Sequence, residues 1–451
     1  MQKDNRQDGQ AGKQGRNNMI KITMLTVLTL AAAFPAAASS QDLDLSQVYS
    51  LASDMAKGAT YGQIAVPMPV AAAPVQVPAA NKAAPKKWTI MVYLDGKNSL
   101  EKFVYTNLHQ MEAVGSTDKV NVVVEVGRMN GQGGDFTGDG NWTGCRRFLI
   151  TKTAKPTDGI SSPVLQTIPV CDMGDYNHAI DFGKWAMTSY PAEHYMYVLW
   201  NHGGGWVATT PGFTNAKAIS YDEETKHVMS TPQMGKIMKA LGHIDVYGSD
   251  ACLMQMAEVA YELRGQTDFV VGSEKTEPGT GWDYTAFLKK VNASGLTAQE
   301  VANSVVDTYT PQYTTGATLS TIKSSAMDGF ADKLNSFVAA VETANEGKVA
   351  AAARESSQNF MAQGSFKENK DLYDLVSLVA ASSKDATVKT AARNLMTYIS
   401  GTLVVDNKVS KDYVKAHGIA IYAPTTGFSK DYSAMLFADT KWPGFIKLMQ
   451  K

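Results

Sequence analysis

Cysteine is scarce in this sequence. Its 451 residues include only Cys145, Cys171 and Cys252. No two of them are spaced as C-x-x-C, which argues against a zinc ribbon or a thioredoxin-like motif. Net charge is also nearly absent, at −1, so electrostatics give no reason to expect nucleic acid or an anionic membrane as a partner. Apart from His202, the histidines lie at no ligand-like spacing, and we predict no metal site and no cofactor.

Residues 1–38 are predicted to be a signal peptide. Lys21 precedes an apolar run from Met24 to Phe34, and small residues follow it, which is the order of a charged region, an apolar region and a cleavage site. The run is short for a bilayer span. Residues 39–85 are rich in proline and alanine, which predicts an extended linker or pro-segment. We therefore expect a secreted or periplasmic protein without a membrane span after signal removal.

Strands and helices alternate from residue 86 onward. Apolar runs at 88–96 and 120–126 flank a segment, 98–114, with apolar residues at helical spacing. This β-α-β order implies parallel strands joined by a right-handed crossover. We predict an α/β sandwich with a mostly parallel central sheet over residues 86–296. Residues 297–451 are mainly helical in pattern, and a late strand at 418–422 is expected to return to the sheet.

Two apolar strands lead into reactive side chains. One runs from Tyr195 into Asn-His-Gly-Gly-Gly at His202, and the other runs from Ile244 into Asp-Ala-Cys at Cys252. Because ligands bind at the carboxyl ends of the strands in open α/β sheets, we expect the imidazole and the thiol to meet at one edge. A thiol beside an imidazole is the minimum equipment of a cysteine peptidase. The backbone N–H groups of Gly203 and Cys252 are candidate oxyanion donors.

Cys252 is also expected to begin a helix, whose dipole would lower the thiol pKa. Taken alone, a cysteine is more often an inert core residue, and a histidine at a strand end can simply bond a carbonyl group. The two lie about 50 residues apart, a separation typical of caspase-like peptidases, which favours the catalytic interpretation. Cys145 and Cys171 either pair in an oxidising compartment or remain free, and the sequence leaves this open.

These motifs resemble the clostripain family of cysteine peptidases, in the same clan as caspases, gingipains and legumain. The resemblance is carried by residues 88–95, 200–206, 248–254 and 278–282. Caspases proper carry Gln-Ala-Cys, so Asp250 points away from them. The resemblance implies a caspase-like α/β/α fold, Cys252 as nucleophile, His202 as general acid and base, and protein or peptide substrates cleaved after Arg or Lys.

Asp250 is the expected specificity residue, because a carboxylate would pair with a basic substrate side chain. The alternative is that Asp250 caps the helix expected at Cys252. A second pocket acid would come from nearby carboxylates, and the candidates are Glu274, Glu277 and Asp283.

Members of this family are commonly zymogens that cut themselves between the histidine and the cysteine. The expected bond here is Lys217–Ala218, which would leave a two-chain form; the rival positions are Lys226, Lys236 and Lys239. Some relatives depend on calcium, but no calcium site is identifiable. Two other functions stay open: a catalytically silent binding protein of the cell envelope, and a legumain-like peptidase cleaving after Asn.

Overall fold

The computed structural model describes residues 85–131, 135–153, 159–206, 218–293, 296–361 and 365–451. The predicted signal peptide, nearly all of the predicted linker and Lys217 lie outside these residues. Within the described ranges, no helix is both long enough and apolar enough to cross a bilayer.

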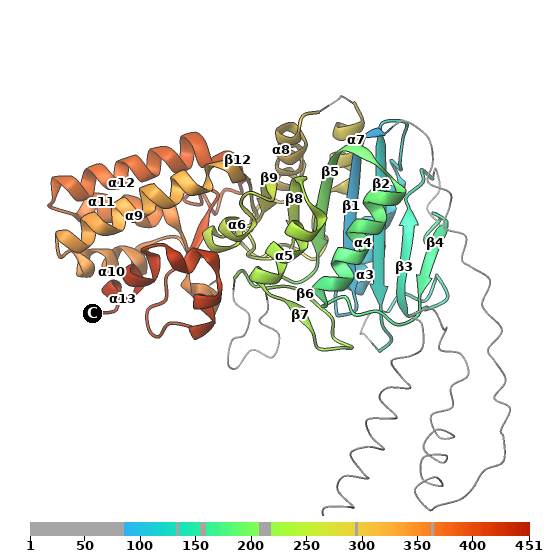
Figure 1. The fold of residues 1–451 in the computed structure, drawn as a ribbon, viewed down its shortest axis with the longest axis horizontal. Helices are drawn as coiled ribbons and strands as arrows, with labels where there is room; N and C mark the ends of the chain where they lie inside the picture. The colour runs from blue at the N-terminus through green and yellow to red at the C-terminus, as the bar shows by residue number, and fades with distance from the viewer. Residues whose placement is uncertain (1–84, 132–134, 154–158, 207–217, 294–295, 362–364) are drawn as a thin grey trace, which may run out of the picture. The chain divides into compact units, whose positions relative to one another are not determined.

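A nine-stranded sheet organises the chain from residue 86 onward (Figure 1). Its strands, in their order across the sheet, are β12 (Val404–Val409), β10 (Thr318–Lys323), β9 (Thr267–Gly272), β8 (Ile244–Asp250), β5 (Ala192–Trp200), β1 (Lys86–Gly96), β2 (Val120–Arg128), β3 (Gly144–Leu149) and β4 (Val164–Ile168). The central strands from β9 to β2 pair in parallel, whereas β10, β12, β3 and β4 pair antiparallel at the two sides.

Helices cover both faces of this sheet. Alternate residues of a strand point to opposite faces, so Ile90, Val92 and Leu94 of β1 pack with the helices α3 (Glu101–Glu112), α7 (Tyr284–Ala293) and α8 (Ala298–Tyr309). Met91 and Tyr93 pack on the other face with α4 (Tyr176–Ser189), α5 (Thr231–Leu241) and α6 (Ala257–Leu263). Coverage on both faces explains why strands such as β2 are apolar and buried along their length. The predicted α/β/α sandwich with a mostly parallel central sheet is confirmed.

The region after residue 297 is mainly helical, as predicted, but the returning strands differ from the prediction. Its helices after α8 are α9 (Met327–Thr343), α10 (Gly347–Ser356), α11 (Leu372–Ser382), α12 (Ala386–Tyr398) and α13 (Trp442–Met449). The strands that join the large sheet are β10 and β12. The predicted late strand exists as β13 (Ala420–Tyr422), but it pairs with β11 (Asn369–Asp371) in a separate two-stranded sheet.

A small hairpin lies next to the carboxyl ends of the central strands. It consists of β6 (Ile219–Tyr221) and β7 (Val228–Met229). An isolated antiparallel bridge joins Gly203 to Ile219, so the hairpin begins directly beside the glycine run that follows β5.

Candidate active site

Strand register brings His202 and Cys252 to the same edge of the sheet. Trp200 of β5 is paired with Asp250 of β8 in parallel register, and each reactive residue follows two positions later. Neighbouring parallel strands therefore deliver the imidazole and the thiol to one place. Both residues are only partly buried, which leaves the site accessible.

Gly203 is required by the close approach of the two strand ends. A Cβ atom at this position would lie 2.2 Å from the Cys252 carbonyl oxygen and 3.0 Å from the Cys252 nitrogen, which no larger residue could tolerate. Without the side chain, the Gly203 N–H can bond the Cys252 sulfur, and this contact lowers the thiol pKa. Gly203 and Cys252 therefore present neighbouring backbone N–H groups beside the sulfur, as the oxyanion prediction requires.

The helix predicted to begin at Cys252 is displaced along the chain. Strand β8 ends at Asp250, and α6 begins only at Ala257, so Cys252 occupies an intervening turn. The sulfur therefore does not lie at the N-terminus of α6, and burial raises the thiol pKa. This rise is opposed mainly by the backbone N–H of Glu277, whose nitrogen lies 3.3 Å from the sulfur. The prediction of a thiol pKa lowered by a helix was therefore wrong, because the chain makes an extra turn before α6.

His202 has a side-chain partner that was not predicted from the sequence. Its Nε2 atom lies 3.1 Å from the Ser99 hydroxyl oxygen. Burial lowers the His202 pKa, and the charge of Glu223 partly opposes this effect. The raised pKa of the thiol and the lowered pKa of the imidazole both favour the uncharged pair in the free molecule.

Ser99 is held in place by a polar turn after β1. The Asn98 side-chain amide donates to the Asp95 carbonyl and, over 2.9 Å, to the Tyr221 carbonyl. Asn201, next to His202, donates to the same Asp95 carbonyl over 2.6 Å. The turn after β1 and the end of β5 thus share a hydrogen-bonded anchor, which fixes the relative positions of Ser99 and His202.

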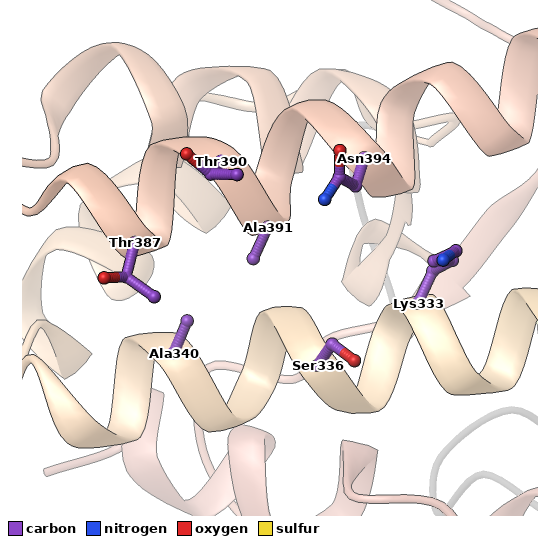
Figure 2. Close-up of a pocket in the computed structure, with 7 residues that line it drawn as sticks. All are labelled: Lys333, Ser336, Ala340, Thr387, Thr390, Ala391 and Asn394. Atoms are coloured by element: carbon purple, nitrogen blue, oxygen red, sulfur yellow. The ribbon is translucent and has the colours of Figure 1, made fainter.

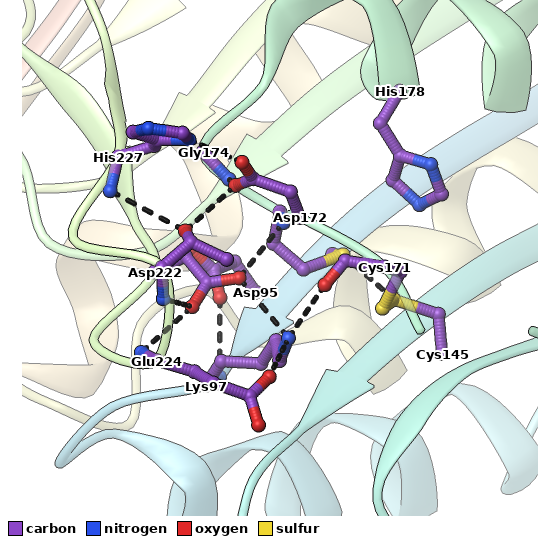
Figure 3. A network of polar contacts seen from close by, with 12 residues as sticks. Asp95, Lys97, Cys145, Cys171, Asp172, Gly174, His178, Asp222, Glu224 and His227 are labelled. Atoms are coloured by element: carbon purple, nitrogen blue, oxygen red, sulfur yellow. Dashed lines mark hydrogen bonds and ion pairs between the residues drawn. A yellow bond between two sulfur atoms is a disulfide. The ribbon is translucent and has the colours of Figure 1, made fainter. Parts of the chain in front are cut away.

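Buried charges reinforce this turn (Figure 3). The Lys97 ammonium group donates to the Cys171 carbonyl over 2.6 Å and lies 3.2 Å from an Asp222 carboxylate oxygen. Burial raises the pKa of Asp95 well above its ordinary value, with a further contribution from the charge of Asp222. The network ties together the end of β1, the Cys171 loop and the segment after β6.

A carboxyl pair lies beside Cys252. Asp250 is buried and accepts hydrogen bonds from the Tyr284 hydroxyl at 2.9 Å and the Trp282 N–H at 3.4 Å. Burial raises its pKa to about 7 despite these bonds and a bond from Glu277. Burial and the neighbouring Asp250 likewise hold the pKa of Glu277 well above its ordinary value. Each carboxyl group thus opposes ionisation of the other, because two adjacent buried carboxylates repel one another.

The loop after β9 places Glu277 against Cys252. Gly281 has φ of +57°, and a Cβ atom there would lie 2.5 Å from an Asp250 carboxylate oxygen, so the turn predicted at 278–282 needs a glycine at this point. Of the three acids that were candidates from the sequence, Glu277 is the one beside Asp250. The helix cap considered for Asp250 is excluded, since α6 begins only at Ala257.

A model of the clostripain family matches residues 92–443. The chain belongs to the clostripain family. It is similar to the clostripain of Hathewaya histolytica, with 28% identity over 238 residues, a stretch that covers 49% of this chain and 45% of that protein. The alignment thus spans less than half the length of this curated relative.

Two solved structures have a similar fold. One is a secreted C11 cysteine protease from Bacteroides thetaiotaomicron in complex with an irreversible peptide inhibitor, with 20% identity, a TM-score of 0.57, and coverage of 80% of this chain and 99% of that chain. The other is an inactive zymogen C11 protease from Parabacteroides distasonis, with 19% identity, a TM-score of 0.59, and coverage of 81% and 99%. At this identity the likeness establishes the fold, and it confirms the predicted caspase-like class.

The bond predicted for self-cleavage borders this clostripain-family site. Lys217 lies outside the described residues, but Ala218 is buried and its carbonyl accepts a 2.9 Å hydrogen bond from the Gly204 N–H. Ile219 then bridges to Gly203. Ala218, on the carboxyl side of the predicted bond, therefore lies next to the glycine run that follows His202.

Cys145 and Cys171 form a disulfide, a pairing that the sequence alone did not decide. His178 lies near the two sulfurs (Figure 3), which gives a second grouping of cysteine and histidine. The disulfide removes both thiols from consideration as nucleophiles or metal ligands, and Cys252 is the free cysteine.

A separate cavity of about 260 Å³ lies between α9 and α12 (Figure 2). Its lining consists of Lys333, Ser336, Ala340, Thr387, Thr390, Ala391 and Asn394. These lining residues include no thiol, imidazole or carboxylate, so they lack the nucleophile and the general base that a cysteine peptidase site needs.

Proposed function

We propose that the chain is a secreted or periplasmic cysteine endopeptidase that cleaves peptide bonds after Arg or Lys. The observation that carries this proposal is the parallel register of β5 and β8, which sets His202 and Cys252 at one edge of the sheet with Gly203 in close contact with Cys252. The disulfide between Cys145 and Cys171 supports export, because such bonds persist in oxidising compartments.

Cys252 would act as the nucleophile. Its thiol passes a proton to His202 as the sulfur attacks the scissile carbonyl carbon, and the N–H groups of Gly203 and Cys252 receive the developing oxyanion. The His202 imidazolium then gives the proton to the leaving amine, which leaves a thioester on Cys252. A water molecule, deprotonated by the same imidazole, hydrolyses the thioester and restores the thiol.

Ser99 would position His202 for this transfer. The Nε2–hydroxyl contact of 3.1 Å leaves Nδ1 as the ring nitrogen available to the thiol. If Nε2 carries the hydrogen and donates it to Ser99, then Nδ1 is unprotonated and can accept. A hydroxyl acceptor also stabilises the imidazolium that forms, which opposes the effect of burial on the His202 pKa.

Asp250 and Glu277 would select the basic side chain. An Arg or Lys side chain that reached this carboxyl pair would stabilise the ionised form of both groups and pair with them through charge-assisted hydrogen bonds. The same pair would repel an acidic side chain. This assignment extends the predicted role of Asp250 to a second acid.

Self-cleavage at Lys217–Ala218 is part of the proposal. Its support is the position of Ala218 and Ile219 beside Gly203 and Gly204. After cleavage, β6 would remain attached through Asn98 and Asn201, which bond the Tyr221 carbonyl and N–H respectively. The product would be a two-chain form. The proposal includes no cofactor.

The experiment compares wild type with Cys252→Ala on peptides that carry a reporter after Arg, Lys, Asn or Asp. We expect turnover after Arg and Lys in wild type only, and covalent labelling of Cys252 by a basic chloromethylketone. Preference for Asn would favour the legumain-like alternative. A folded wild type that neither turns over any peptide nor becomes labelled would identify a silent binding protein and refute the proposal.

A further inference from the structure

A second cluster of potential ligands lies at the opposite edge of the sheet from Cys252. His243 directly precedes β8, Asp245 is the second residue of β8, and Asp268 is the second residue of β9. One ligand atom from each of these three residues lies within 4.8 Å of the others. The cluster therefore gathers at the amino ends of two adjacent parallel strands, away from the carboxyl ends that carry the proposed catalytic groups.

Strand register places two carboxyl groups of this cluster next to one another. Ile244 pairs with Thr267 and Val246 with Phe269, so Asp245 and Asp268 lie side by side on adjacent strands. Like charges in such positions are destabilising.

One member of the cluster is already fixed in position. The Asp245 carboxylate accepts a hydrogen bond from the Tyr195 N–H over 2.8 Å and lies 2.7 Å from His194 Nδ1. A carboxylate held by an outer histidine and a backbone N–H resembles the supporting shell that orients metal ligands. The Asp245 side chain is 10% exposed, so its position is set by the fold.

The other two members can adjust around it. The His243 and Asp268 side chains are 60% and 46% exposed, and His243 Nε2 lies 3.2 Å from an Asp268 carboxylate oxygen. Ligands about 2.0–2.2 Å from a tetrahedral zinc ion lie roughly 3.4 Å apart. The His243–Asp268 separation already fits this value, and a small rotation of the exposed side chains would close the remaining gap to Asp245.

We propose that His243, Asp245 and Asp268 bind a divalent transition-metal ion such as Zn²⁺, with water at the fourth position and His194 as the outer partner of Asp245. An imidazole nitrogen in the ligand set favours zinc, nickel or copper over calcium or magnesium, which prefer oxygen ligands. This site departs from our sequence-based expectation of no metal, because its ligands come from two strand starts and no local motif connects them.

The ion would link the starts of β8 and β9, the strands that lead to Cys252 and Glu277. Strand β8 alone spans about 17 Å from Asp245 to Asp250, and Cys252 lies beyond its end, so the metal would not take part in the proposed peptidase chemistry. It would stabilise the folded state by binding it in preference to the unfolded chain.

The test uses tag-free Cys252→Ala protein, which lacks the thiol that would otherwise compete for zinc. Titration calorimetry and thermal unfolding are measured with ZnCl₂, CaCl₂ and MgCl₂. We expect one equivalent of Zn²⁺ to bind and to raise the midpoint of unfolding, with no such effect of Ca²⁺ or Mg²⁺. Adding His243→Ala or Asp268→Asn should weaken zinc binding at least about tenfold.

His227→Ala is the matched control. His227 is also an exposed histidine paired with an aspartate, Asp172, but the described residues place no third ligand with them. Zinc affinity should be unchanged in this variant. Equal zinc binding by His243→Ala, Asp268→Asn and the parent would overturn the proposal, as would an equal loss in His227→Ala or a preference for Ca²⁺. None of these results depends on whether the chain is an active peptidase.

Discussion

Replacing Glu277 by glutamine should make the protein more stable at alkaline pH and less active on basic substrates. In the free molecule, burial and Asp250 raise the Glu277 pKa well above its ordinary value. A group whose pKa is raised on folding contributes stability below its unfolded pKa and loses it as pH rises through the folded pKa. Wild type should therefore lose stability from about pH 5 upward, and Glu277→Gln should lose less.

The magnitude follows from the contacts of the pair. Burial moves the pKa of Asp250 from 3.8 to about 7, which corresponds to a shift on the order of 4 kcal/mol for that group. The glutamine amide can donate permanently to the Asp250 carboxylate, whereas Glu277 donates only while protonated. A hydrogen bond to a charged group contributes roughly 1.5–3 kcal/mol, and we expect a gain of that size at pH 8.

The same change removes one negative charge from the proposed specificity pocket. Loss of one charge-assisted bond to Arg or Lys should lower kcat/KM about 10- to 100-fold. Stability is measured by denaturant unfolding at pH 5 and pH 8 in the Cys252→Ala background, and activity is measured in the active enzyme. Glu342→Gln, a half-exposed glutamate on α9, is the control and should change neither. If Glu277→Gln is less stable than its parent at pH 8, or keeps full activity on basic peptides, the reasoning is refuted.

Three further predictions concern the dyad and the disulfide. Ser99→Ala should lower kcat about tenfold or more with little change in KM, and Ser99→Thr should restore most of it; equal pH–rate profiles for wild type and Ser99→Ala would exclude a positioning role for the hydroxyl. Alkylation of Cys252 by iodoacetamide should accelerate steadily as pH rises from 6 to 8, because burial raises the thiol pKa and the thiolate is the reactive form. A rate that is constant from pH 6 to pH 8 would show a preformed thiolate. Joint replacement of Cys145 and Cys171 by alanine should cost ~3.5 kcal/mol of unfolding free energy for a crosslink that spans 26 residues, measured with urea; a change below about 1 kcal/mol would contradict it.

The apolar runs of the sequence predicted the strands of the central sheet well. The apolar runs that lead to His202 and Cys252, together with the β-α-β order along the chain, were enough to predict a parallel sheet with both residues at one edge. Both signals can be read locally in the sequence. The sequence did not decide whether Cys145 and Cys171 form a disulfide. Pairing depends on the geometry of β3 and the Cys171 loop, which no local sequence pattern encodes. The late strand was recognised but given to the wrong sheet, since the pairing partner of a short strand is set by tertiary packing.

The sequence could not predict the partners that loops bring to the dyad. Ser99 follows β1 by three positions and reaches His202 only because Asn98 and Asn201 bond the same Asp95 carbonyl. An Asn-Ser pair after a strand was the one signal of this contact, but such pairs are common in turns. Glu277 lies 25 residues after Cys252, and only the course of the loop after β9 distinguishes it from the other candidate acids.

The wrong prediction about the Cys252 helix changes how activation must work. A thiolate stabilised by a helix dipole would be ready in the free molecule, but here burial raises the Cys252 pKa and lowers the His202 pKa. Both shifts favour an uncharged thiol and an uncharged imidazole in the free molecule, and the Glu277 N–H bonds the Cys252 sulfur. A basic side chain that binds Asp250 and Glu277 would engage the same residue through its carboxylate. Substrate binding would then be coupled, through Glu277, to release of the Cys252 sulfur from its hydrogen bond with the Glu277 N–H. A peptide that lacks a basic side chain should therefore show a lower kcat as well as a higher KM.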